Sequence, residues 1–342
     1  MPEHKPIYIL AIESSCDDTS AAILMNDKVL SNVVATQAIH EEYGGVVPEL
    51  ASRAHQQNIV PVVDQAIARA NIDKKQLSAI AFTRGPGLMG SLLVGTSFAK
   101  SLSLGLDIPL IEVNHMKAHI LAHFIADEKM TSPKFPFLAL TISGGHTQVV
   151  QVNDYFEMKI IGQTLDDAVG EAFDKSAKIL GLPYPGGPLI DKHAANGNPH
   201  KFEFPIPKVK DLDFSFSGLK TNILYFIQRN TKDNPNFINE NLEDICASIQ
   251  DTIIEILMRK LKKAVKQTGI KEVAIGGGVS ANSGIRKALT DAQEKYGWKT
   301  YIPQFQYCTD NAAMIGIVGY HKFKNEIFSK QDITAQARYV IS

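Results

Sequence analysis

Cysteine is scarce in this chain of 342 residues, which has only Cys16, Cys246 and Cys308, far apart and odd in number. This spacing excludes a dense disulfide framework and favours a reducing compartment. No run of roughly eighteen apolar residues is present, which argues against a membrane-spanning helix. The N-terminal stretch MPEHKPIYILAIE has neither the sustained apolar region nor the small-residue cleavage site of a secretory signal. We therefore expect a cytoplasmic protein that has no membrane partner.

An excess of charge of either sign is also absent, because 35 Lys and Arg residues face 36 Asp and Glu residues, for a net charge of −1. The overall balance therefore gives no support for nucleic-acid binding, although local basic segments remain. One of them, Met258–Gln267, fits either a solvated helix face or a local binding patch. A hydrophobic content of 44% and a length of 342 residues are typical of a globular enzyme with two lobes or one large α/β domain.

The sequence contains an internal repetition of its predicted elements. Residues 6–37 predict strand, polar turn, strand, turn at Asn26-Asp27 and strand, and residues 136–165 repeat this order with a turn at Asn153-Asp154. Residues 77–115 and 271–310 each predict strand, glycine loop, helix and strand. When Ile80 is aligned with Ile275, His115 falls opposite Asp310. We therefore infer an internal duplication. The second half contains an insertion of about 65 residues, which we expect to be helical.

Known phosphate-binding fingerprints are missing: there is no GxxxxGK[ST] loop, and TRGPGLMG does not match the dinucleotide pattern. Glycine-rich turns nevertheless follow predicted strands at Ser143–Gln148, Tyr184–Pro188 and Gly276–Asn282. Each alone fits a plain turn or a nest of N–H groups that binds an anion. Three of them in a duplicated α/β chain favour a nucleotide-binding cleft.

The segment VNHMKAHIL places His115 and His119 four residues apart, hence on one face of a helix. They could hold a metal ion together, or be two polar histidines at a helix start. A metalloprotease would have Glu directly after the first histidine, and here that residue is Met116, which argues against peptide hydrolysis. The repeat adds Asp310 as a third candidate ligand, although an Asp before an apolar helix can also be a helix cap.

Asp17 and Asp18 lie in the first predicted strand-turn-strand, where a nucleotide-binding lobe would place groups facing phosphate or metal. Both could instead stabilise the turn through side-chain to backbone hydrogen bonds. Cys16 in the same turn is predicted to be structural, because no histidine can be placed beside it from the sequence.

The motifs together resemble the bacterial tRNA N6-adenosine threonylcarbamoyltransferase family, called TsaD and formerly labelled O-sialoglycoprotein endopeptidase. The resemblance extends over nearly the whole chain. It rests on AIESSCDDTSAAI, YGGVVPELASRAH, GPGLMGSLLVG, NHMKAHI, ISGGHTQ, GEAFDKSAKILGLPYPGGPLID, DFSFSGLKT, GGGVSAN and CTDNAAMI.

The resemblance implies an α/β fold with two duplicated lobes, shared by actin, sugar kinases and chaperone ATPases (the ASKHA fold). The expected N-terminal lobe is residues 1–135, completed by residues 310–342. The expected C-terminal lobe is residues 136–309, with a helical insertion at about 165–270.

The resemblance also implies a reaction, in which the threonylcarbamoyl group moves from threonylcarbamoyl-AMP to N6 of an adenosine in tRNA. That adenosine lies next to the anticodon (position 37) in tRNAs that read codons beginning with A. One divalent metal ion per subunit is implied, with Fe(II) the first choice and Zn(II) the alternative. The implied partners are tRNA, a smaller paralogous TsaB-like subunit and a small TsaE-like ATPase.

Site residues follow from the same resemblance. The implied metal ligands are His115, His119 and Asp310. The implied nucleotide or substrate site comprises Thr141, Ile142, Ser143, Gly144, Gly145, Asp174, Gly187, Asp191 and Asn282. Asp17 is the candidate for a supporting acid or base.

The family often has Glu where this chain has Asp18, which leaves the role of that position open. Three alternatives to the transferase also remain open. A kinase or ATPase of the same fold would need carboxylates that bind Mg(II), and a metallopeptidase would need the missing Glu. A scaffold without catalytic activity would bind no metal.

Overall fold

The computed structural model describes residues 5–37, 39–128 and 130–341. The chain divides into two compact units, Met1–Ser132 with Pro303–Ser342, and Pro133–Ile302. Within the described residues, no helix is both long enough and apolar enough to cross a membrane.

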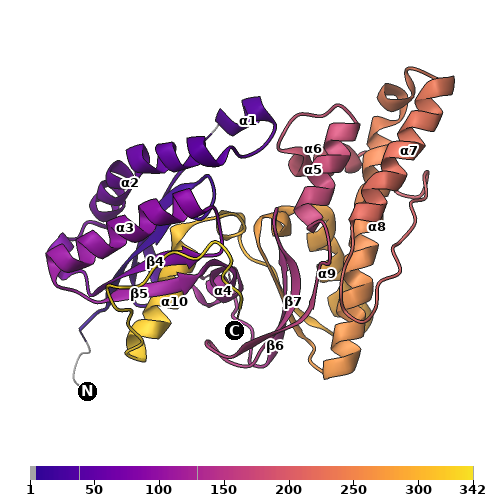
Figure 1. Ribbon diagram of the computed structural model, residues 1–342. Helices are drawn as coiled ribbons and strands as arrows, with labels where there is room; N and C mark the ends of the chain where they lie inside the picture. The colour runs from indigo at the N-terminus through magenta and orange to yellow at the C-terminus, as the bar shows by residue number, and fades with distance from the viewer. Residues whose placement is uncertain (1–4, 38, 129, 342) are drawn as a thin grey trace. The chain divides into compact units, whose positions relative to one another are not determined.

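The first unit is built on a five-stranded sheet in the order β3-β2-β1-β4-β5, in which β1 pairs antiparallel with β2 and parallel with β4. Figure 1 labels β4 and β5 of this sheet. Its strands are β1 (Tyr8–Glu13), β2 (Thr19–Met25), β3 (Lys28–Ala35), β4 (Ala79–Gly85) and β5 (Leu110–Asn114). Its helices are α1 (Ile39–Tyr43), α2 (Pro48–Ala70), η1 (Lys74–Gln76), α3 (Met89–Leu106), α4 (His115–Leu121), η2 (Ala122–Phe124), η4 (Phe305–Tyr307) and α10 (Ala312–Lys324).

Alternation along β1 explains how this sheet is covered on both faces. Leu10 and Ile12 belong to the hydrophobic core that α2 and α3 complete. Ala11, which lies between them, faces α10, where Gly316 and Gly319 allow a close approach: a Cβ on Gly316 would lie 2.2 Å from a Leu24 methyl carbon and 3.2 Å from the Ala11 Cβ. Helix α10 therefore lies against the strands that carry the β1–β2 turn.

The second unit repeats this topology in a sheet of order β10-β9-β6-β7-β8. Its strands are β6 (Phe137–Ile142), β7 (Thr147–Val152), β8 (Met158–Gln163), β9 (Glu272–Gly276) and β10 (Lys299–Tyr301). Its helices are α5 (Val169–Ile179), α6 (Gly186–Ala194), α7 (Ser217–Asp233), α8 (Phe237–Thr268), η3 (Gly278–Ala281) and α9 (Ser283–Tyr296). Four helices thus lie between β8 and β9, in the chain region where the helical insertion was expected.

Strand register confirms the duplication but corrects part of the sequence alignment. In β1, Ile12 pairs with Ala21, and in β6 the equivalent Leu140 pairs with Val149. In the parallel neighbours, Leu10 pairs with Ile80, whereas the equivalent Leu138 pairs with Val273. Ile80 is therefore equivalent to Val273 and not to Ile275, so His115 and Asp310 are not matched residue for residue. A hydrophobic pattern of period two cannot detect a shift of two residues.

Candidate metal centre and substrate loops

Helix α4 begins at the end of β5 and brings the two histidines together. The Asn114 side chain caps the helix, because its Oδ1 accepts hydrogen bonds from the N–H groups of Met116 and Lys117. His115 and His119 are then one turn apart, and their ring centroids lie 4.7 Å from each other.

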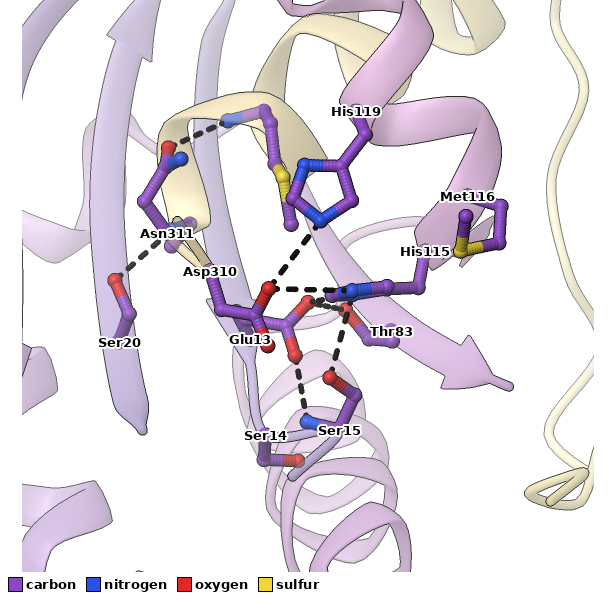
Figure 2. Close-up of polar contacts among 12 residues, drawn as sticks. Glu13, Ser14, Ser15, Ser20, Thr83, His115, Met116, His119, Asp310 and Asn311 are labelled. Carbon is purple, nitrogen blue, oxygen red and sulfur yellow. Dashed lines mark hydrogen bonds and ion pairs between the residues drawn. The ribbon is translucent and has the colours of Figure 1, made fainter. Parts of the chain in front are cut away.

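Asp310 reaches the same point from the start of α10. The Asn311 side chain caps α10 by accepting from the N–H of Met314, and the N–H of Ala312 donates to the Ser20 hydroxyl on β2. Asp310 Oδ1 lies 3.3 Å from His115 Nε2 and 3.2 Å from His119 Nε2 (Figure 2). The structure therefore brings together the three residues predicted as metal ligands, and one ligand atom from each lies within 4.8 Å of the others.

The three side chains suit a divalent cation. His119 is fully buried, yet its Nδ1 has no hydrogen-bond partner within the described part of the chain. Such an unsatisfied group is costly unless it binds something. Asp310 keeps 26% of its side chain exposed, which gives an ion access to the cluster. Two imidazoles and one carboxylate form a donor set that suits Fe(II) or Zn(II).

The ionisable groups of the cluster perturb one another strongly. Burial by itself would lower the pKa of His115, but the negative charges of Asp310 and Glu13 outweigh it and hold that pKa well above its usual value. Burial opposes ionisation of Asp310 as well, but the positive charge of His115 keeps the carboxyl pKa lowered. The pKa of His119 is lowered, chiefly by burial. Without an ion, the cluster thus holds a proton on His115 between two carboxylates.

Glu13, which the sequence reasoning did not identify, belongs to this site. It is the last residue of β1 and is completely buried, and its Oε2 lies 3.0 Å from His115 Nδ1. A signal was available in the sequence, since an acidic residue ends an otherwise apolar strand in ILAIESS.

The β1–β2 turn contains Asp17, which is half-buried. Its neighbour Asp18 has a carboxyl pKa raised to about 7 by burial and by the charges of Asp17 and Asp310. Burial and Asp17 also raise the pKa of the Cys16 thiol, which keeps it protonated at neutral pH and agrees with the predicted structural role. His55 on α2 anchors the turn through the Cys16 carbonyl and the Thr19 hydroxyl.

In the second unit, Thr141–Gly145 forms the end of β6 and the turn into β7. The N–H of Ser143 donates to the His146 carbonyl across the turn, and a Cβ on Gly144 or Gly145 would meet nothing within 4 Å. The buried hydroxyls of Thr141 and Ser280 have no hydrogen-bond partner among the described residues. Ile142 is buried in the core of this unit. The turn therefore exposes backbone beside buried polar groups that remain unsatisfied.

The other predicted substrate residues make contacts that order helix starts. Asp174 Oδ1 accepts from the N–H groups of Gly186 and Gly187 at the start of α6, at 2.8 and 3.2 Å. Asp191 accepts from both the N–H and the hydroxyl of Ser283 at the start of α9.

Asn282 caps α9 by accepting from the N–H of Ile285, and its amide donates to Gln250. The structure therefore pairs Asp174 with Gly187 and places Asp191 next to Asn282. Asp174 on α5 and Asp191 on α6 thus each order the start of another helix, and Asn282 orders the start of α9.

Residues 28–317 match the protein family described as "TsaD: tRNA N6-adenosine threonylcarbamoyltransferase". The chain belongs to this family. A relative from Christiangramia forsetii with the same enzyme name is 73% identical over 97% of this chain and 98% of its own length. Another, from Riemerella anatipestifer, is 62% identical over 99% of both chains. For this family member the sequence resemblance is thus confirmed over essentially the full length.

Comparison with solved structures identifies the fold of this family member. Full-length HypF in its phosphate- and nucleotide-bound form aligns with a TM-score of 0.62 at 14% identity, over 94% of this chain and 47% of HypF. The fold is the duplicated α/β fold of the actin, sugar-kinase and chaperone-ATPase group, as predicted.

Proposed function

We propose that this chain transfers the threonylcarbamoyl group from threonylcarbamoyl-AMP to N6 of adenosine 37 in tRNAs that read codons beginning with A. The products are N6-threonylcarbamoyladenosine and AMP. The observation that carries the proposal is the cluster of His115, His119 and Asp310, found in a chain that belongs to the family named for this transfer.

The proposed metal ligands are Nε2 of His115, Nε2 of His119 and a carboxylate oxygen of Asp310, with Fe(II) as the first choice and Zn(II) as the alternative. A divalent ion bound there would act as a Lewis acid and as a template for the threonyl and carbamate oxygens. Met116 follows His115 where a peptidase would need its general base, so the cluster fits substrate orientation better than water activation.

The donor is a mixed anhydride of a carbamate and AMP, so its carbonyl carbon is electrophilic. The N6 amine forms the new C–N bond, the C–O bond to the phosphate breaks, and AMP leaves. We assign the phosphate to the N–H groups of the turn at Gly144 and Gly145, where the backbone is open. Thr141, Ile142, Ser143, Asp174, Gly187, Asp191 and Asn282 complete the proposed site. Asp17 is proposed to accept the proton that the amine loses.

The proposal extends to lobes, partners and location. We infer that the N-terminal lobe comprises residues 1–135 and 310–342, and the C-terminal lobe residues 136–309. A smaller TsaB-like paralogue and a small TsaE-like ATPase would act with the chain on tRNA in the cytoplasm. Partners would help a chain with a net charge of −1 to hold a polyanion.

The experiment that tests the function is a transfer assay with the purified chain, its two expected partners, synthetic threonylcarbamoyl-AMP and unmodified tRNA. Nucleoside mass spectrometry should detect N6-threonylcarbamoyladenosine, and AMP should appear in equal amount. Absence of product with a partner set that supports a known family member would contradict the proposal. Formation of the threonylcarbamoylated product in a reaction that contains no tRNA would contradict the proposal that a tRNA adenosine is the acceptor.

The Asp174 assignment makes a separate prediction. Asp174→Ala should weaken AMP binding about tenfold, roughly 1.4 kcal/mol, because the carboxylate orders the N–H groups at the start of α6. Calorimetric titration with AMP measures this. The matched control is Asp166→Ala, which removes a carboxylate that accepts from Phe216 and Ser217 N–H groups at α7 and should leave AMP affinity unchanged. Equal affinities in all three proteins would remove Asp174 from the site.

A further inference from the structure

Glu13 is held rigidly by hydrogen bonds on both of its oxygens. Oε1 accepts from the N–H of Ser15 at 2.6 Å, and Oε2 accepts from the Thr83 hydroxyl at 2.6 Å. The same Oε2 lies 3.0 Å from His115 Nδ1. Figure 2 draws this contact between the two side chains. Because no part of the residue is exposed, its position is set by β1, β4 and the β1–β2 turn.

This contact determines which nitrogen of His115 carries hydrogen. A carboxylate can only accept, so the nitrogen facing Glu13 must be the N–H donor. Once a bound cation takes the place of the proton on Nε2, the nitrogen that faces Asp310, His115 would keep its remaining hydrogen on Nδ1. A ligand ring held in this way presents a fixed donor atom at a fixed angle. His119 lacks a comparable contact, since its Nδ1 is buried without a hydrogen-bond partner in the described chain.

The internal duplication indicates that the fold itself does not require an acid at this position. Strand register makes Thr141 the equivalent of Glu13: Glu13 pairs with Ser20 in β1–β2, and Thr141 pairs with Gln148 in β6–β7. Both residues are completely buried: Glu13 is the last residue of β1 and Thr141 the second-last residue of β6. A buried carboxylate is costly. Of these two equivalent positions, only the one in the first unit has a carboxylate, and there Glu13 contacts the candidate metal ligand His115.

We propose that Glu13 is the positioning residue of the metal centre, which fixes the tautomer and orientation of His115 so that Nε2 can bind a divalent cation. This inference rests on the proposed function, because it requires a metal at His115, His119 and Asp310. It adds a role for a residue that contacts neither the ion nor the substrate.

The test uses Co(II) as a spectroscopic probe on the metal-depleted full-length chain. Glu13→Gln should weaken Co(II) binding about 10- to 100-fold and change the visible absorption bands that report ligand geometry. Nitrogen-15 NMR of labelled imidazoles in the chain loaded with diamagnetic Zn(II) should show His115 with its hydrogen on Nδ1 in the wild-type protein and as a mixture of tautomers in the variant. If Glu13→Gln does not fold, Glu13→Asp is the second variant. It keeps the negative charge but moves the carboxylate away from His115 Nδ1, so Co(II) binding should weaken less.

The matched control is Glu112→Gln, which removes a carboxylate of the same unit that pairs with Arg84 and should leave Co(II) affinity unchanged. Wild-type affinity and spectrum in both Glu13 variants would overturn this inference and leave the proposed function intact. An equal loss in Glu112→Gln would also overturn it, because the effect would then be one of general charge. Absence of Co(II) binding by the wild-type chain would overturn the metal site itself, whereas the transfer assay tests the reaction independently.

Discussion

Replacing His115 or Asp310 by Ala should lower threonylcarbamoyl transfer at least about 100-fold, because each change removes one of three converging ligand atoms. Transfer is measured by the tRNA assay described above, and metal content by elemental analysis of the same samples. The wild-type chain should hold about one divalent ion, and each variant much less. Asp310→Asn is the sharper variant, since it preserves the shape of the side chain and removes only its charge.

The control for losing a buried histidine from this segment is His123→Ala, on η2 just after α4. It should retain metal and activity even if it lowers stability. Full transfer by metal-depleted wild-type protein would contradict the role assigned to the ion. If His115→Ala keeps a normal metal content but loses transfer, His115 is not a metal ligand, and its imidazole must have another function in the reaction.

Gly277→Ala should destabilise the chain by about 3 kcal/mol or more, the second largest effect that we expect. Gly277 joins β9 to η3 with φ 92° and ψ 161°, a region that only glycine occupies readily. An added Cβ would also lie 2.4 Å from the Ile142 carbonyl oxygen at the end of β6. Because backbone is on both sides of this contact, neither side can move without disturbing the turn proposed to bind the AMP phosphate.

Thermal and urea unfolding measure this effect, and AMP titration of the folded fraction reports on the turn. Gly297→Ala is the matched control: Gly297 ends α9 with φ 65°, and a Cβ there would meet nothing within 4 Å. It should cost only about 1 kcal/mol, the conformational part of the penalty. Equal destabilisation by the two variants would show that the contact with Ile142 contributes nothing.

Local sequence patterns determined much of this protein. Alternating apolar residues with the turns after β2 and after β7 predicted both sheets and their duplication. The four-residue spacing of His115 and His119 placed two candidate metal ligands on one helix face, and the missing Glu after His115 argued against a peptidase. The motif resemblance led to the family to which the chain belongs.

Only the tertiary structure decided which residues complete the site. The position of Asp310 depends on α10 lying against the sheet of the first unit, and the alignment that suggested it was shifted by two residues. Glu13 lies about a hundred positions before His115, so no local pattern could pair them. Asp174 and Asp191 were predicted to belong to the nucleotide or substrate site, and the structure adds that both hold helix starts. Periodicity reports the face of an element, whereas convergence of side chains from distant strands and helices depends on how those elements pack.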